Sequence, residues 1–164
     1  TLSMNGAPVG RELDNFSFRE EFQALDSDGD KEDGSIMIVV ATDAPLDART
    51  LERLSMRAMM GLARTGSFAS NGSGDYVIAF STHPKARRPR VSKGPVETAV
   101  TVNASMSPLF AATAEATEEA IYNAILKATT VKSSRGELTE ISINKVKNIL
   151  KKYRSLDWDK TLSP

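Results

Sequence analysis

The chain has 164 residues, and its 21 Lys and Arg side chains balance 21 Asp and Glu side chains, so the formal net charge is zero. This length fits one domain or the larger part of one, and 40% hydrophobic with 26% charged residues is typical of globular proteins. A neutral chain is poorly suited to gripping a nucleic-acid backbone. The absence of cysteine excludes disulfides and thiol chemistry, and a single histidine, His83, excludes sites that need a His pair.

The first 22 residues are expected to form a short extended segment. Asn5-Gly6 is typical of a turn, and Pro8 and Gly10 disfavour a helix. No apolar run in the whole chain approaches the ~20 residues that a membrane helix needs. Because the chain starts at Thr rather than Met, a processed or truncated piece stays possible.

Residues 23–34 are strongly acidic and contain almost no apolar side chain, which predicts an exposed loop. The first three ligand spacings of an EF-hand calcium loop are matched by Asp26, Asp28 and Asp30. The rest of that pattern fails, because Lys31 stands where an EF-hand requires glycine and Met37 stands where it requires glutamate. A solvated loop is therefore favoured over a calcium site.

The middle of the chain alternates strand and helix patterns. The continuous apolar run at 36–41 predicts a strand covered on both faces. A helix is expected over 47–65, with Asp47 as its N-cap. Residues 75–81 alternate and predict a second strand, with an apolar face made of Tyr76, Ile78 and Phe80.

The second half predicts further elements of both kinds. After a basic, proline-rich loop at 84–95, we expect a short strand at 98–102 and helices at 107–127 and 142–154. The 107–127 helix should begin with Ser107 as N-cap. Alternating strands and helices of this kind predict an α/β fold.

The junction Gly34-Ser35 joins the acidic loop directly to the buried strand. A serine hydroxyl is a weak nucleophile and needs a base. The base could be His83, in a Ser-His-Asp triad, or the α-amine of Ser35 itself if the chain is cleaved before it, because that amine has a reference pKa of ~7.7–8.0. Gly34 lacks a Cβ, so it could let the cleaved bond adopt strained backbone angles.

The stretch 71–75, NGSGD, is the other candidate for chemistry. Its two glycines allow close backbone approach, and Ser73 and Asp75 are two residues apart, so their side chains should point to the same side. A simple turn before the strand is the alternative interpretation.

Three separated blocks carry a family resemblance: GSIMIVVATDAPLDARTLERLSMRAMMGLARTGS, SNGSGDYVIAFST and SPLFAATAEATEEAIYNAIL. In their order and spacing they resemble the DmpA and β-aminopeptidase family of self-processing N-terminal-nucleophile aminopeptidases. The resemblance runs from about GAPVGREL at 6–13 to about residue 130. It implies an αββα layered sandwich, with this chain supplying part of the sheets and flanking helices.

The resemblance also implies residue roles. A precursor would cleave itself between Gly34 and Ser35, and Ser35 would then be the nucleophile, assisted by Ser73 and Asp75. Residues 1–34 would be the C-terminal end of an α-chain, and 35–164 a β-chain. An upstream asparagine of the family's oxyanion hole falls outside this sequence.

The resulting prediction is a serine aminopeptidase or amidase that releases N-terminal residues from short peptides, amides or esters. It would use no metal or organic cofactor. Its partners would be its own α-chain and further copies of itself, with no nucleic acid and no membrane. A cytoplasmic location is favoured over a periplasmic one. The alternatives are an acyltransferase of the ornithine acetyltransferase type, which would be expected to use threonine, and an inactive homologue acting as an assembly module.

Overall fold

A computed structural model describes residues 2–13, 34–87, 90, 93–134 and 136–156. The chain divides into two compact units. The first joins the N-terminal residues to 64–68 and to 119–164, and the second contains 33–63 and 69–118. None of the helices in the described ranges is long and apolar enough to cross a membrane.

A pair of parallel strands forms the centre of the second unit. Strand β1 spans Met37–Thr42 and β2 spans Tyr76–Ser81, with Met37 opposite Tyr76 and Thr42 opposite Ser81. Helix α3, Ala48–Arg64, connects them. This strand–helix–strand unit confirms the strands and the helix that hydrophobic periodicity predicts here.

The Asp47 side chain caps α3 as expected. Its Oδ1 accepts a hydrogen bond from the Thr50 backbone N–H at 2.8 Å and another from the Thr50 hydroxyl at 2.6 Å. These bonds favour the ionised carboxylate and hold the pKa of Asp47 below its ordinary value. At the other end, Gly66 adopts a positive φ of 97°, a conformation that is typical of the glycine that ends a helix.

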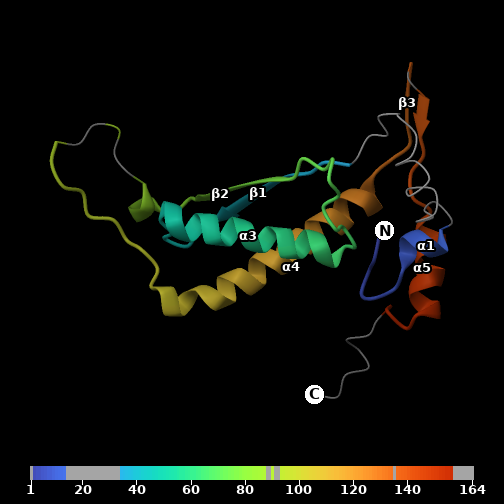
Figure 1. Cartoon of the computed structure of the whole chain (residues 1–164), viewed down its shortest axis with the longest axis horizontal. Helices are drawn as coiled ribbons and strands as arrows, with labels where there is room; N and C mark the ends of the chain where they lie inside the picture. The colour runs from blue at the N-terminus through green and yellow to red at the C-terminus, as the bar shows by residue number, and fades with distance from the viewer. Residues whose placement is uncertain (1, 14–33, 88–89, 91–92, 135, 157–164) are drawn as a thin grey trace. The chain divides into compact units, whose positions relative to one another are not determined.

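Helix α4 spans Met106–Lys127, slightly earlier than predicted, because a 3₁₀ turn at Asn103–Ser105 leads into it and replaces the expected Ser107 cap. Together with α3 it lies on one side of β1 and β2 (Figure 1). The core there is formed by Leu46, Leu54 and Met106, with Val40 of the sheet, Leu51, Leu109 and Phe110 packed against it.

Gly61 lets α3 and α4 approach each other closely. A Cβ at this position would collide with the backbone oxygen of Ala114 and lie 2.7 Å from the Cβ of Thr117. The facing stretch of α4 is correspondingly made of small buried side chains, Thr113, Ala114 and Thr117.

We therefore predict that Gly61→Ala destabilises the full-length protein by about 1–3 kcal/mol, because the added methyl meets main chain that cannot rotate away. Helix propensity alone would stabilise this substitution by about 1 kcal/mol, so the two causes predict opposite signs. Urea unfolding measures the sign, and a gain in stability would contradict the close packing.

The predicted strand at 98–102 is wrong. These residues are irregular, and two of their backbone N–H groups bond outside any strand: Ala99 donates to the carbonyl of Lys85, in the 3₁₀ turn Pro84–Ala86, at 3.2 Å, and Thr101 donates to the Pro45 carbonyl at 2.8 Å. A strand needs a neighbouring strand for its ladder, and the described residues place none there.

In the first unit, the predicted turn at Asn5-Gly6 is confirmed. Both residues have positive φ, and Met4 and Ala7 exchange backbone hydrogen bonds across them. The expectation that Pro8 and Gly10 prevent a helix is wrong, because the short helix α1, Val9–Glu12, follows Pro8. One turn needs no long run of favourable residues, and Pro8 lies before its first helical residue.

Helix α5, Ile143–Lys152, begins at the Ser142 cap and packs against the N-terminal residues to form the core of the first unit. Val146 and Ile149 pack against Met4, Ala7 and Val9. A small antiparallel hairpin, β3 (Val131–Ser133) and β4 (Gly136–Leu138), precedes it and was not predicted.

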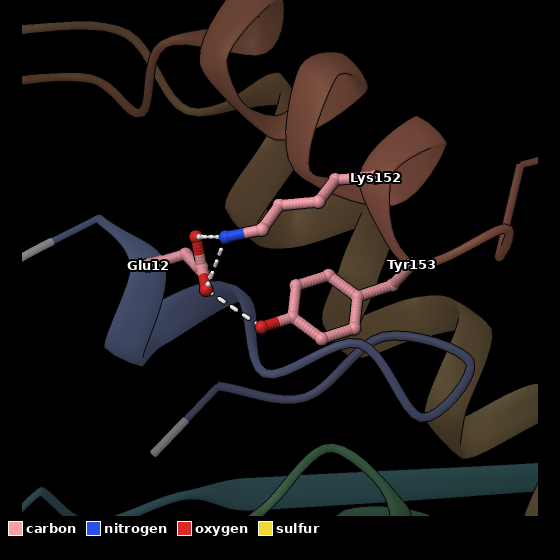
Figure 2. Close-up of polar contacts among 3 residues, drawn as sticks. All are labelled: Glu12, Lys152 and Tyr153. Atoms are coloured by element: carbon pink, nitrogen blue, oxygen red, sulfur yellow. Dashed lines mark hydrogen bonds and ion pairs between the residues drawn. The ribbon is translucent and has the colours of Figure 1, made fainter.

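A polar cluster joins α1 to the end of α5 (Figure 2). The Lys152 ammonium donates to both carboxylate oxygens of Glu12, at 2.9 and 2.7 Å, and the Tyr153 hydroxyl donates to Oε1 at 2.6 Å. These hydrogen bonds lower the pKa of Glu12 and raise the pKa of Lys152 and of Tyr153.

The cluster should stabilise the first unit fully only in the pH range between the ordinary pKa of Glu12 and that of Lys152. A lowered Glu12 pKa gives stability that is present above its ordinary value of 4.5 and lost as pH falls. The raised pKa of Lys152 gives stability present below 10.5 and lost as pH rises.

We expect Glu12→Gln to lower the Tm of the full-length protein at neutral pH by less than Gly61→Ala does, because exposed ion pairs contribute little. The difference from wild type should vanish below the carboxylate's titration range. Thermal unfolding of both proteins from pH 7 down to pH 2 measures this, and a difference in Tm that does not change with pH would contradict an ionic role.

Candidate active site

The parallel pairing brings the three candidate residues together at one edge of the β1–β2 sheet. Ser35 lies just before β1, and Ser73 and Asp75 lie just before β2. The ladder begins with a hydrogen bond of 3.0 Å from the Tyr76 N–H to the Ile36 carbonyl. Parallel strands have their N-terminal ends at the same edge, so residues 39 positions apart become neighbours.

Ser73 makes the central contacts of the site. Its Oγ lies 2.7 Å from the carbonyl oxygen of Gly34 and 2.7 Å from Oδ1 of Asp75. Both partners are acceptors, whereas a serine hydroxyl carries one proton, so it can donate fully to only one of them at a time. Ser73 can therefore either polarise the Gly34 carbonyl or bond to the carboxylate of Asp75.

Asp75 is held in place by main chain from the other strand. The Ile36 N–H donates to its Oδ1 at 3.2 Å, so the carboxylate bridges the residue after Ser35 and the Ser73 hydroxyl. Its second oxygen, Oδ2, is buried and has no hydrogen-bond partner among the described residues. Burying an acceptor without a hydrogen bond costs free energy of folding. Because Oδ2 has no partner, it can accept a hydrogen bond from a group that arrives during a reaction.

The Gly74 N–H donates to Oγ of Ser35 at 3.0 Å. A backbone donor aimed at a serine oxygen stabilises negative charge that develops there when the hydroxyl loses its proton. The two glycines of NGSGD predict a close backbone approach, which the structure confirms at Gly74. They could not predict this particular donor, because any residue except proline carries an N–H.

The interpretation of Gly34 as a source of backbone strain is not supported. Its φ lies outside the left-handed region, and a Cβ added there would meet no atom within 4 Å. Its backbone conformation is open to residues with side chains, because no steric barrier opposes one.

Gly34→Ala should accordingly leave the local structure unchanged, since open space accommodates a methyl group. The rate of any cleavage of the 34–35 bond should stay within about threefold of wild type. The rate of appearance of the cleaved fragments, followed by intact mass, measures the effect. A block of cleavage in Gly34→Ala together with normal cleavage in Gly10→Ala would show that this position does require glycine.

His83 lies beyond the opposite end of the strands from Ser35. It follows β2, whose last residue pairs with the last residue of β1, whereas Ser35 precedes the first pair. Six paired positions at ~3.3 Å per residue separate the two by about 20 Å, beyond any hydrogen bond. Its ring Nδ1 instead accepts from the Lys85 N–H at 3.2 Å. The Ser-His-Asp alternative is therefore excluded for this chain's own histidine.

The candidate calcium ligands Asp26, Asp28 and Asp30 lie outside the described residues. Within the described ranges, no group of three or more His, Asp or Glu side chains is placed to hold a metal ion.

With this geometry established, comparison with known proteins identifies the family. Residues 1–139 match Peptidase family S58, and the chain belongs to that family. The chain is 38% identical over 161 residues to the β-peptidyl aminopeptidase BapA of Sphingosinicella microcystinivorans, covering 94% of this chain and 40% of that protein.

Two solved structures are similar in fold. The PH0078 protein from Pyrococcus horikoshii OT3 gives a TM-score of 0.78 at 39% identity, covering 94% of this chain and 39% of that one. The L-aminopeptidase D-Ala-esterase/amidase of Ochrobactrum anthropi gives a TM-score of 0.78 at 28% identity, covering 94% and 40%. The latter is described as a prototype for the serine aminopeptidases and a variant of the Ntn hydrolase fold.

These likenesses confirm the α/β, DmpA-type fold expected from the sequence. The second unit supplies one sheet and one helix layer of such a sandwich. The chain spans about two fifths of the length of the relatives that it matches.

Proposed function

We propose that this chain forms part of a serine aminopeptidase that activates itself by cleaving the Gly34–Ser35 bond. The observation that carries the proposal is the position of the Ser73 Oγ, 2.7 Å from both the Gly34 carbonyl oxygen and the Asp75 carboxylate. Residues 1–34 would then end an α-chain, and residues 35–164 would form the β-chain.

Self-cleavage begins with attack by the Ser35 hydroxyl on the Gly34 carbonyl carbon. A C–O bond forms, the C–N bond to Ser35 breaks, and the hydroxyl proton passes to the departing amine. Ser73 donates a hydrogen bond to the carbonyl oxygen that becomes negative in this step, and the Gly74 N–H stabilises the attacking oxygen. Water then hydrolyses the ester, which leaves a Gly34 carboxylate and restores the Ser35 hydroxyl.

Cleavage would change the task of Ser73. Once Gly34 has departed, the Ser73 hydroxyl loses one acceptor and can bond to the new α-amine or to the Ser35 hydroxyl. It can both donate and accept, so it can relay a proton between them while Asp75 fixes its orientation. A carboxylate in direct contact with the amine would instead favour its charged form, which cannot act as a base.

Turnover would repeat the same chemistry on a substrate. The neutral Ser35 amine accepts the hydroxyl proton, the oxygen attacks the substrate carbonyl, and an acyl-enzyme forms as the substrate's amine or alcohol leaves with that proton. Water deacylates the enzyme. Short peptides, amides or esters are the proposed substrates, in keeping with the aminopeptidase, esterase and amidase names of the relatives.

We expect Ser35→Ala to abolish both self-cleavage and hydrolysis in the full-length protein, because one hydroxyl performs both reactions. Ser35→Thr or Ser35→Cys should keep some cleavage. Intact mass and release of amine from a short peptide amide measure the two reactions, and cleavage or turnover in Ser35→Ala would contradict the proposal. His83→Ala is the control and should keep nearly full turnover, since its ring lies at the other end of the sheet.

Ser73→Ala and Asp75→Asn should each lower kcat/KM by roughly the 10²–10⁴-fold typical of acid–base groups. The double variant should be little worse than either single variant, because the two side chains act as a unit. A double-mutant cycle on full-length protein measures the coupling, with kcat/KM referred to the fraction of each variant that intact mass shows to be cleaved, because Ser73 also acts in self-cleavage. Fully additive losses, or an Asp75→Asn variant with a shifted pH optimum and an undiminished maximal rate, would show that Asp75 acts on the amine directly.

A further inference from the structure

Gly74 leaves a small space beside the Ser35 hydroxyl. A Cβ built at this glycine would lie 3.5 Å from Oγ of Ser35 and 3.5 Å from Cε2 of Tyr76, in ordinary van der Waals contact with both. Apart from Ser73 and Asp75, its neighbours in the chain, no other described residue comes within 4 Å of that point. We call this space, between the Ser35 oxygen and the Tyr76 ring, the Gly74 gap.

The two distances limit the width of the gap. Both atoms lie 3.5 Å from the same point, so they are at most about 7 Å apart. Non-bonded carbon atoms are in best contact at about 3.5–4.0 Å, so the gap has room for the thickness of one carbon atom, as in a methyl or methylene group. A branched or cyclic group would have to push the Tyr76 ring aside.

The Tyr76 ring is accessible from the side of the nucleophile. Tyr76 on β2 stands opposite Met37 of β1, and side chains alternate along a strand, so Ser35 falls on the same face as Met37. Tyr76 is 63% exposed, and its hydroxyl has no hydrogen-bond partner among the described residues. The edge of the ring is therefore open to a ligand that approaches Ser35.

The gap lies where a substrate would react. A carbonyl carbon approaches its nucleophile to about 3–3.5 Å before the bond forms, so a group in the gap would be next to the reacting carbonyl. The gap is lined by ring carbon, and the nearby Gly74 N–H already bonds to Oγ of Ser35. This lining suits the carbon substituent of the carbonyl better than its oxygen or the leaving group, which need hydrogen bonds.

Self-cleavage makes a different use of the site. The attacked carbonyl is then that of Gly34, whose oxygen lies 2.7 Å from the Ser73 hydroxyl. A Cβ on Gly34 would meet no atom within 4 Å. A side chain on the acyl residue of this reaction would therefore not touch the Tyr76 ring, so the ring matters for substrates and not for the chain's own bond.

We propose that Tyr76 is a specificity-determining residue, whose ring limits the size of the group that a substrate carries on the carbon next to the scissile carbonyl. Short peptides, amides or esters with a methylene or a methyl-bearing carbon at this position fit the Gly74 gap, and those with a branched group do not. The inference deepens the proposed function and rests on it, because it requires Ser35 to be the nucleophile.

Probes that differ only in this group test the inference. They are p-nitroanilides whose carbon next to the carbonyl carries a methyl or an isopropyl group, prepared in the α-amino and the β-amino acid series. Full-length wild-type protein should prefer methyl at least about tenfold in kcat/KM, because a pocket that rejects extra carbon atoms typically discriminates 10–200-fold. Tyr76→Leu, which has no atom at the Cε2 position, should reduce this preference at least about fivefold, chiefly by lowering KM for the isopropyl probe.

Two further variants isolate the ring edge. Tyr76→Phe keeps the ring without the hydroxyl and should keep the wild-type preference. Phe80→Leu is the matched control, because Phe80 alternates onto the same face of β2 but lies four residues, or about 13 Å, further along the strand. A ratio of two kcat/KM values does not depend on the fraction of folded protein, so a loss of stability would leave it unchanged.

Self-cleavage provides the second measurement. Its rate in Tyr76→Leu, followed by intact mass, should stay within about threefold of wild type, as for an exposed position that takes no part in the reaction. Self-cleavage that slows as much as turnover does would overturn the inference, since the ring would then act on Ser35 itself.

The preference between the probes decides the rest. No preference in wild type, an unchanged preference in Tyr76→Leu, or an equal change in Phe80→Leu would overturn the inference and leave the proposed function standing. A wild-type protein that hydrolyses none of the probes, or that keeps the Gly34–Ser35 bond intact, would overturn the proposed function and this inference with it.

Discussion

The parallel register of β1 and β2 is the constraint on which the candidate site depends. Ser35 and Ser73 approach each other only because Met37 pairs with Tyr76, which sets both serines at the same edge. A slip of β2 by one residue would turn its side chains to the opposite face and move Ser73 away from the Gly34 carbonyl. Val40 of β1 packs against the helical core on one side of the strands, and α3 and α4 approach each other closely at Gly61.

The sequence allowed the residues of the candidate site to be named, but not all of their contacts to be predicted. Three observations on the sequence pointed to side chains that do lie together: the apolar run that follows Gly34-Ser35, the two-residue spacing of Ser73 and Asp75, and the family resemblance. The Gly74 N–H and the Ser73 bond to the Gly34 carbonyl depend on strand register and on main-chain direction, which residue types do not encode.

Long elements with a repeating apolar pattern could be predicted from the sequence, whereas elements of only three or four residues could not. Helix α3 follows an extended apolar stripe and begins at the expected Asp47 cap, whereas the Ser142 cap of α5 was not predicted. The β3–β4 hairpin has three residues per strand, all exposed, so no buried side alternates with an exposed one to reveal it. Its stability comes from contacts such as the exchange of hydrogen bonds between Thr130 and Glu140, at 3.1 Å each.

The β1 run shows a different relation between sequence and structure. Its apolar continuity predicts cover on two faces, and the described chain covers one. The apolar run is therefore longer in pattern than the cover that the described residues provide. The same holds for the site, where Asp75 Oδ2 is buried without a partner among the described residues.

The central claim is that the Gly34–Ser35 bond is cut to make Ser35 an N-terminal nucleophile. N-terminal sequencing of the mature full-length protein tests it most directly. The account predicts a fragment that begins Ser-Ile-Met-Ile, starting at Ser35, in a preparation that hydrolyses a short peptide amide. A fully active preparation in which this bond is intact, or whose new N-terminus lies elsewhere, would contradict it.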